Sequence, residues 1–310
     1  MTERCCYFLQ THRDPEQVYR LVRTLRAGSP RSIVLVQHNF NAGALDWAPL
    51  AEMADVHLMR LPYRQVRGGF SYIAQPLLDA IGWLEREAGG GWDWLVTLSG
   101  QDYPVMPLAL SERHLRESGC DAFLRYWDVR SPANPWRPER ARHRYWYRYR
   151  HLPDSVVPWM PLLRQLVYLV PGLHLSRSYG PDLGVRALRT PWSASFRCYG
   201  GRTWMMLGRP AARYLLDYLR DHPGLVAYYQ RTLVPDESIV QTVLANSGGF
   251  RLENDDLRFI DYSRAVKGSP RNLGADDLPE LGSGRYAFAR KFEWPADREL
   301  LDRIDRELLS

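Results

Sequence analysis

Cysteine is scarce in this sequence and shows no pattern of a metal site. The chain has four cysteines, namely Cys5, Cys6, Cys120 and Cys198. Adjacent cysteines, such as the first two, rarely bridge each other, and the spacing of the four matches neither a zinc site nor a disulfide framework. We therefore expect no structural disulfides.

Long apolar segments are also lacking. The sequence has no run of about 18 apolar residues, the length that a membrane-spanning helix requires. Residues 1–10 contain no long apolar signal region either. We therefore expect a cytoplasmic protein of bacterial type, and leave open whether it lies at the inner face of the cell membrane.

The composition is that of an ordinary globular protein with an excess of positive charge. The 310 residues are 45% hydrophobic and 25% charged, which allows one large domain or two small ones with a sizeable core. The net charge of +6 is compatible with nucleic acid, a membrane surface or an anionic small substrate. The 11 tryptophans and 18 tyrosines suit stacking on sugars or bases, or a large core.

The first half of the chain alternates short apolar segments with helical patterns. The expected strands are 5–10, 32–37, 56–59, 94–98 and 123–126. One expected helix covers 14–25, with Asp14 as N-cap and Pro15 at the first position, and another follows a tight loop at 68–71. The strands do not alternate in polarity, which is typical of strands covered on both faces. This order predicts an α/β fold with a mostly parallel central sheet flanked by helices.

Polar residues follow the expected strand at 94–98. Ser99, Gly100, Gln101 and Asp102 would lie at its carboxyl end, where such sheets bind their ligands. Asp102 could bind a substrate hydroxyl or cap a turn, and the sequence leaves both alternatives open.

Residues 130–190 are rich in proline and arginine. If the run 140–150 is extended, alternate residues share one face, namely Arg142, Arg144, Trp146, Arg148 and Arg150. Arginine and aromatic side chains on one face bind phosphates and stack on bases, so nucleic-acid binding is a competing function. The alternative is a surface excursion whose arginines are solvated or pair with acids elsewhere. The apolar segment 158–175 would be a packing helix or a weak membrane-surface segment.

Residues 233–247 could present a carboxylate at the start of a helix. Pro235 suits the first helical position, which places Asp236 and Glu237 in the first turn, where the helix dipole favours acids. Apolar residues follow at helical spacing, namely Ile239, Val240, Val243 and Leu244. The two acids either only stabilise the helix, or one of them is a general base. Further helices are expected at 210–219 and 297–309, and a strand at 257–261.

Eight short motifs, taken in order, resemble one glycosyltransferase family. They are Thr-His-Arg-Asp-Pro at 11–15, Gly-Gly-Phe-Ser at 68–71, Leu-Ser-Gly-Gln-Asp-Tyr-Pro at 98–104, Gly-Arg-Thr-Trp at 201–204, Leu-Val-Pro-Asp-Glu-Ser at 233–238, Leu-Arg-Phe-Ile-Asp at 257–261, Gly-Ser-Pro at 268–270 and Phe-Ala-Arg-Lys-Phe at 288–292. The family comprises the core-2/I-branching β-1,6-N-acetylglucosaminyltransferases and the peptide O-xylosyltransferases. The resemblance covers most of the chain except about residues 130–190.

The resemblance implies a GT-A-type fold and an inverting transfer from a UDP-sugar, of the N-acetylglucosamine or xylose class, to an acceptor hydroxyl on a bacterial glycan. It places the general base at Glu237 and the diphosphate grip at Arg290 and Lys291. The remaining expected contacts are Asn39, Gly68 and Gly69 for the donor, and Asp102, Trp204, Asp236 and Arg271 for the substrate. We expect no metal and no other cofactor, because no Asp-X-Asp motif follows a strand of the first half.

Two departures from the family pattern leave the donor sugar open. Asn39 ends Gln-His-Asn where the family commonly has His-Val-Asp, and Arg67 replaces the tryptophan of Trp-Gly-Gly. We expect a single domain over 1–310, with a nucleotide-binding half at 1–129, the basic and aromatic excursion at 130–190, and an acceptor and catalytic half at 191–310. The expected partners are a UDP-sugar and a glycan acceptor, without nucleic acid; a peripheral membrane contact and the oligomeric state stay open. A scaffold of the same fold without activity is a further alternative.

Overall fold

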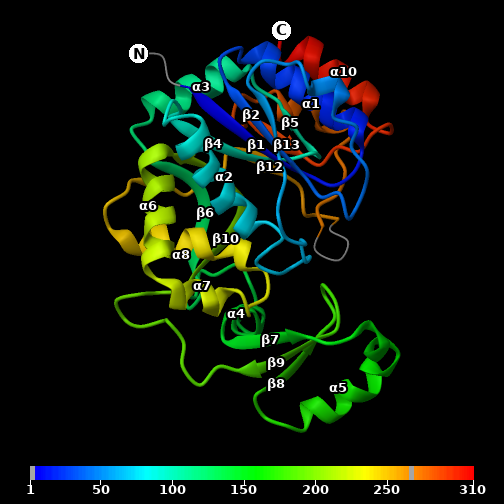
Figure 1. Ribbon diagram of the computed structural model, residues 1–310. Coiled ribbons are helices and arrows are strands. Elements are labelled where there is room, and N and C mark those ends of the chain that lie inside the picture. Colours follow the sequence, from blue (N-terminus) through cyan, green and yellow to red (C-terminus); the bar gives the residue numbers. More distant parts are fainter. Residues whose placement is uncertain (1–3, 265–268) are drawn as a thin grey trace.

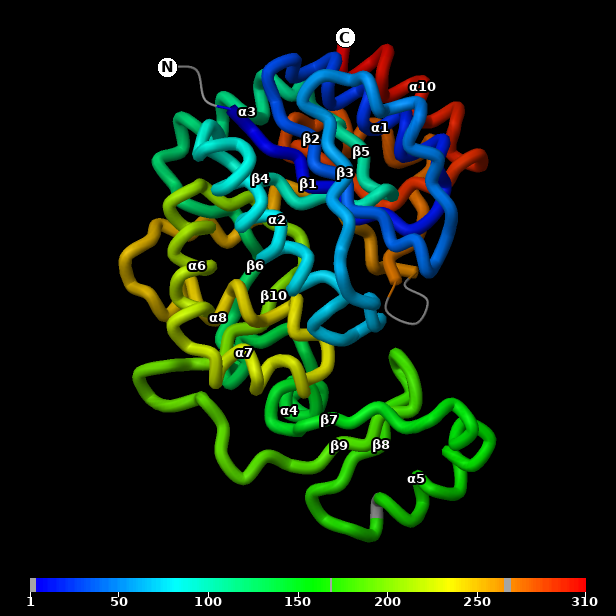
Figure 2. The backbone as a smooth tube through the Cα atoms, viewed as in Figure 1, coloured from blue at the N-terminus to red at the C-terminus, as the bar shows by residue number. Residues whose placement is uncertain are grey.

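The computed structural model describes residues 4–264 and 269–310, and Gly268 of the Gly-Ser-Pro motif lies outside these residues. The fold is built on a sheet of seven strands in the order β11-β6-β10-β4-β1-β2-β3 (Figure 1, Figure 2). These strands are β1 (Cys5–Thr11), β2 (Ile33–His38), β3 (Val56–Met59), β4 (Trp94–Ser99), β6 (Ala122–Asp128), β10 (Tyr199–Gly208) and β11 (Leu252–Glu253). All neighbours are parallel except at β10, which is antiparallel to both β4 and β6. The predicted mostly parallel α/β sheet is confirmed.

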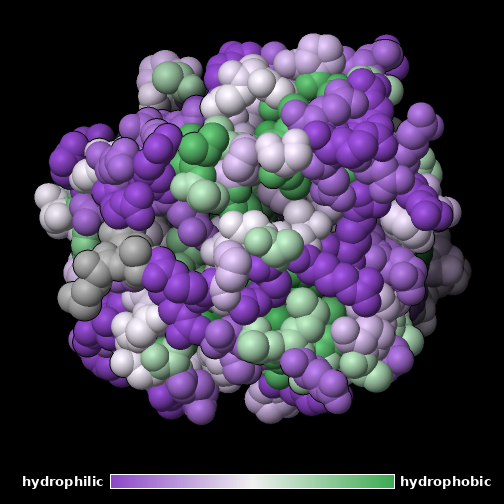
Figure 3. All heavy atoms as spheres, turned by 90° about the horizontal axis from the view of Figure 1, so that it is seen from above, coloured by the Kyte–Doolittle hydropathy of each residue, from purple (hydrophilic) through white to green (hydrophobic). Residues whose placement is uncertain are grey.

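Helices cover both faces of this sheet. One layer contains α1 (Pro15–Gly28), α3 (Leu108–Glu117) and α10 (Arg298–Glu307), and the other contains α2 (Ala74–Glu87), α6 (Arg209–Asp221) and α8 (Ile239–Ser247). The short α7 (Pro223–Tyr229) follows α6, and α9 (Leu278–Leu281) precedes the last strand. Seen from above, the end of the molecule that carries α1, α3 and α10 is mostly hydrophilic, with hydrophobic side chains in small groups (Figure 3).

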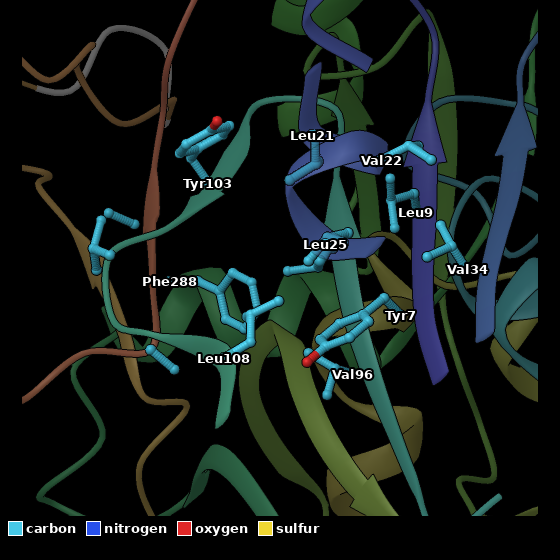
Figure 4. Close-up of a cluster of buried hydrophobic side chains, with 14 of the residues drawn as sticks. Tyr7, Leu9, Leu21, Val22, Leu25, Val34, Val96, Tyr103, Leu108 and Phe288 are labelled. Atoms are coloured by element: carbon cyan, nitrogen blue, oxygen red, sulfur yellow. The ribbon is translucent and has the colours of Figure 1, made fainter. Parts of the chain in front are cut away.

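The central strand β1 shows why both layers are needed. Its side chains alternate between two hydrophobic clusters, with Tyr7 and Leu9 in one and Cys6 and Phe8 in the other. Figure 4 shows the first cluster, in which side chains of β1 meet those of α1. A strand buried on both faces is apolar throughout, and this explains why the sequence of β1 does not alternate.

A second sheet of three strands brings distant motifs together. It has the order β12-β13-β5, with β5 (Asp102–Pro104), β12 (Arg258–Ile260) and β13 (Phe288–Arg290). In the register, Arg290 lies opposite Asp102 on one side and Ile260 on the other. This sheet therefore places the 98–104 motif beside the Phe-Ala-Arg-Lys-Phe motif.

A third sheet, separate from the other two, is formed within residues 147–186, which we call the excursion sheet. It has the order β7-β9-β8, with β7 (Tyr147–His151), β8 (Leu173–Ser176) and β9 (Asp182–Arg186), and α5 (Met160–Tyr168) packs beside β8. The helix α4 (Pro138–Tyr145) leads into it (Figure 1, Figure 2). The predicted extended face on 140–150 is therefore wrong, because the run divides between the end of a helix and a strand.

Two predicted helix starts need correction. The helix expected from Pro235 begins at Ile239, and Pro235–Glu237 forms a 3₁₀ turn. Val234 has φ +52°, so the chain enters this turn from a left-handed conformation rather than through a regular helical N-terminus. Asp14 does hold the N-cap position of α1, but its side chain makes no capping hydrogen bond. In the described part of the chain, no helix is long and apolar enough to cross a membrane.

Candidate active site

The candidate site lies at the carboxyl ends of the parallel strands. Because β10 runs in the opposite direction, its first residues reach this same edge beside β4 and β6. The β10 ladder is irregular between Gly201 and Met205, and the residues between them are Arg202, Thr203 and Trp204. Such interruptions re-aim side chains. A side chain at position 201 would have its Cβ 2.0 Å from the carbonyl oxygen of Arg125, so the close approach requires glycine.

Glu237 is held by an arginine from the excursion region. Arg144 donates from Nη1 to Glu237 Oε2, and the side chains of these residues are 8% and 26% exposed. The Arg144 guanidinium also lies 4.5 Å from the ring centroid of Trp136. A buried guanidinium without a partner would be costly, so the pair fixes the position of the Glu237 carboxylate. The prediction that excursion arginines pair with acids elsewhere is correct for Arg144.

Asp236 faces the opposite direction, into the protein. It is buried, and Thr203 Oγ1 donates to its Oδ2 at 2.9 Å. Burial, followed by the charge of Glu237, raises the pKa of Asp236 to about 6. Asp236 belongs to the 3₁₀ turn before α8 and not to the first turn of a helix as predicted, and its contact with substrate stays a prediction.

Asp236→Asn is expected to stabilise the protein at neutral pH. The native state raises this pKa from 3.8 to about 6, so the native state binds more protons and stability falls as the pH rises through that interval. Removing the charge should raise the free energy of unfolding by up to about 3 kcal/mol above pH 6, and by little below pH 4. Urea unfolding of both proteins across this range measures the difference. A difference that does not change with pH would contradict the prediction.

Arg290 and Trp204 form the basic side of the site. The Arg290 guanidinium lies 4.4 Å from the ring centroid of Trp204, and Arg258 lies 5.4 Å from the same ring. The Arg290 side chain is 11% exposed, and its Nε and Nη1 have no hydrogen-bond partner among the described residues. Buried donors of this kind are normally satisfied, so they would suit an anion.

Asp102 is the carboxylate that lies next to the arginines of this basic side. It is fully buried and accepts hydrogen bonds from the backbone N–H of Ser99 at 2.7 Å and from Ser99 Oγ at 2.5 Å. Its carboxylate lies 3.3 Å from Arg258 Nε and 3.8 Å from Arg290 Nη1. Asp102 thus forms the turn contacts that the turn-capping alternative requires, and its contact with a substrate hydroxyl stays a prediction.

Sequence reasoning missed Arg258, and the structure gives Arg271 partners within its own loop. Arg258 is buried and donates from Nη2 to the carbonyl oxygen of Thr97 at 2.9 Å, whereas the sequence predicts a strand and a family motif at 257–261 but no site residue there. The guanidinium of Arg271 is bound to Asp261, to Asp277 and to the carbonyl oxygen of Asn272, and its contact with substrate stays a prediction. Three acceptors hold the loop together and leave no nitrogen uncommitted.

Lys291 lies beside this basic side, next to Arg290 in the chain. Its Nζ is 3.2 Å from Ser269 Oγ and 3.5 Å from Glu293 Oε1. A flexible amine held by one hydroxyl and one partly exposed carboxylate can turn toward a stronger anion.

The predicted donor residues Gly68 and Gly69 form a loop against the Glu237 turn. The carbonyl oxygen of Gly68 accepts a hydrogen bond from the N–H of Val234 at 2.9 Å. Gly68 has φ +76°, and a Cβ there would lie 2.2 Å from the ring of Tyr179, in the excursion region. Only glycine adopts this φ without strain and leaves room for the ring. Asn39 follows β2, and its Oδ1 accepts the N–H of Asn41 at 3.2 Å.

The interrupted part of β10 links the acidic and basic sides. Thr203 donates to Asp236, the chain neighbour of Glu237, and Trp204 lies against Arg290. Among the described residues, no group of three or more His, Cys, Asp or Glu side chains could hold a metal ion. Metal independence stays a prediction.

Comparison with known proteins relates part of the chain to a family. Residues 173–281, about a third of the chain, match the family described as Core-2/I-Branching enzyme. The matched range contains Trp204, Glu237 and Arg258, and the resemblance predicted from the eight motifs is confirmed.

Three curated plant proteins are similar to the chain beyond the Core-2/I-Branching range. Beta-glucuronosyltransferases GlcAT14B and GlcAT14A of Arabidopsis thaliana are each 29% identical over 75% of this chain, which spans 47% and 46% of their lengths. GlcAT14C of the same plant is 24% identical over 97% of this chain and 72% of its own. The chain thus spans about half the length of the first two relatives.

A solved structure gives a much weaker match. It is a putative glucose-1-phosphate thymidylyltransferase from Bacillus anthracis in complex with a sucrose, with 8% identity, a TM-score of 0.37, and coverage of 80% of this chain and 85% of that one. This likeness is too low to support an argument about fold or function.

Proposed function

We propose that the protein is an inverting glycosyltransferase that moves a sugar from a UDP-sugar to an acceptor hydroxyl without a metal ion. The observation that carries the proposal is that the interrupted part of β10 adjoins two groups: Thr203 binds Asp236 next to the partly exposed carboxylate of Glu237, and Trp204 lies against the nearly buried guanidinium of Arg290. Nε and Nη1 of Arg290 lack hydrogen-bond partners among the described residues. The two groups are the base and the counter-charge that such a transfer requires.

The proposed reaction is a single displacement. The acceptor hydroxyl gives its proton to Glu237 as its oxygen attacks the anomeric carbon of the donor. The bond from that carbon to the UDP oxygen breaks with its electron pair, and the negative charge develops on the diphosphate. Arg290 holds two phosphate oxygens with its fork, and Lys291 adds a point charge.

Neighbouring residues position these groups without reacting. Arg144 occupies Oε2 of Glu237, which leaves Oε1 to accept the proton. Trp204 lies over Arg290, and the carboxylate of Asp102 lies close to the guanidinium groups of both Arg290 and Arg258 and offsets part of their charge. Preorganised charges of this kind act strongly because they need no rearrangement during the reaction.

The donor sugar is the least determined part of the proposal. The family resemblance implies the N-acetylglucosamine or xylose class, whereas the names of the three plant relatives add a glucuronosyl group to the candidates. The acceptor is proposed to be a hydroxyl-bearing glycan. The nucleic-acid alternative has lost its central residue, because Arg144 is buried against Glu237.

The test is binding and turnover of nucleotide sugars with and without a chelator. We expect UDP to raise the thermal midpoint, and one donor among UDP-N-acetylglucosamine, UDP-xylose and UDP-glucuronate to release UDP when an acceptor is added. EDTA should change neither result, because fixed cations replace the metal. Loss of UDP binding in EDTA would refute the metal-independent mechanism, and salt-dependent binding of RNA or DNA with no UDP binding would refute the function.

A further inference from the structure

The helix α5 exposes an apolar stripe at the far end of the excursion sheet. The stripe consists of Trp159, Leu162, Leu166, Leu169 and Val170, whose exposed fractions run from 49% for Val170 to 79% for Leu169. Leu162 and Leu166 lie on α5 about one turn apart, and Trp159, Leu169 and Val170 flank the helix. The inner side of the same helix contains Met160, which is buried. Thus α5 is apolar on the side that packs on the protein and again on its exposed side.

Positive charge surrounds this stripe. Among the described side chains of residues 147–190, one acid is exposed, Asp154, and six arginines are exposed, namely Arg148, Arg150, Arg164, Arg177, Arg186 and Arg189. The other acid of this segment, Asp182, is buried beside His151.

One of these arginines lies beside the end of the stripe. The backbone N–H of Arg186 donates to the carbonyl oxygen of Gly172 at 2.7 Å, two residues beyond Val170. Arg148 lies opposite Val185, which is 52% exposed, and Arg186 follows Val185 in β9, so Arg148 and Arg186 lie on opposite faces of the excursion sheet. The stripe therefore belongs to a segment that exposes arginines on both faces of its sheet.

We propose that this surface docks on an anionic lipid bilayer, with the stripe inserted at the level of the headgroups. A helix that exposes tryptophan and leucine among arginines matches this environment. Its apolar side chains suit the boundary with the acyl chains, and the arginines attract acidic headgroups. The indole of Trp159 suits the same interface.

Charge favours a bilayer over a second copy of the chain. A twofold contact through the stripe would bring together two segments that each expose six arginines and one acid, and these like charges repel. An anionic bilayer removes this repulsion and covers the same apolar side chains. The inference does not depend on the transferase activity, because it concerns a surface outside the candidate site.

Flotation of the full chain with vesicles tests the proposal. Vesicles of phosphatidylcholine with phosphatidylglycerol should bind the protein at least about tenfold more tightly than phosphatidylcholine alone, and high salt should weaken this preference. The double variant Leu162→Ser/Leu166→Ser should lose about tenfold or more in binding. The double variant Arg148→Gln/Arg186→Gln should bind acidic vesicles more weakly and should bind phosphatidylcholine vesicles as the natural sequence does.

Matched controls come from the opposite end of the molecule. Leu110→Ser removes a leucine of α3 that is 42% exposed, and Arg116→Gln/Arg306→Gln removes two exposed arginines from α3 and α10. Both should bind vesicles like the natural sequence, and thermal melts should show that every variant is folded. The proposal is overturned if acidic vesicles are not bound, or if the serine variant binds as well as the natural sequence. Light scattering that shows a dimer converted to a monomer by the serine substitutions would also overturn it, in favour of contact between copies.

Discussion

Glu237→Gln is expected to reduce turnover by about 10² to 10⁴ while leaving folding and UDP affinity nearly unchanged. The amide keeps the shape of the carboxylate and can still accept a hydrogen bond from Arg144, but it cannot take a proton from the acceptor hydroxyl. Initial rates of UDP release with saturating donor and acceptor measure the loss, and calorimetry with UDP measures the affinity.

Two further variants separate the base from its surroundings. Asp236→Asn alters the adjacent carboxylate, which is buried on Thr203, and should cost less than about tenfold in rate. Arg144→Ala should slow the natural enzyme but cause little further loss of rate in the Glu237→Gln variant. If Arg144 acts only by positioning Glu237, the losses of the two substitutions do not add. Equal losses for the glutamine and Asp236→Asn variants, or an active Glu237→Gln enzyme, would show that the proton goes elsewhere.

Arg290→Ala and Lys291→Ala should each weaken UDP binding by about 1.5–3 kcal/mol, the range for hydrogen bonds to charged groups. The larger loss is expected for Arg290, because its fork is nearly buried and already held over Trp204, whereas Lys291 must leave Glu293. Titration calorimetry with UDP measures both dissociation constants.

The chain offers controls for this prediction as well. Arg290→Lys retains the charge without the fork and should fall between alanine and arginine. Arg298→Ala removes an exposed arginine that lies over Trp294, and should leave UDP affinity unchanged. UDP affinity that survives Arg290→Ala in a folded protein would place the diphosphate elsewhere.

The main sheet could be predicted because its signals are local. Each strand from β1 to β4 is an apolar run bounded by polar or turn residues, and α1 has its apolar residues at helical spacing. Composition alone also marked residues 130–190 as different. None of these inferences requires knowledge of which distant segments meet.

The site depends on contacts between distant segments, and here the residues alone were insufficient. Arg144 and Glu237 are 93 positions apart, and no local pattern joins them. Arg271 carries the right charge for a substrate contact, but the acids that bind it could be recognised only from the folded loop. Family resemblance named Glu237 and Arg290, whereas the roles of Arg258 and Asp102 as supports required the register of the second sheet.

The packing of Gly68 against Tyr179 limits how this protein can be re-engineered. The excursion sheet resembles a detachable module, since its three strands pair only with one another in the described part of the chain. Yet position 68 has no room for any side chain while Tyr179 is present, and its carbonyl oxygen is bound to Val234 beside Glu237. A chimaera that exchanges residues 147–186 for those of a relative would replace Tyr179, against which the loop at Gly68 packs. Exchanging this segment therefore requires that the glycine loop and the residue at 179 be transplanted together.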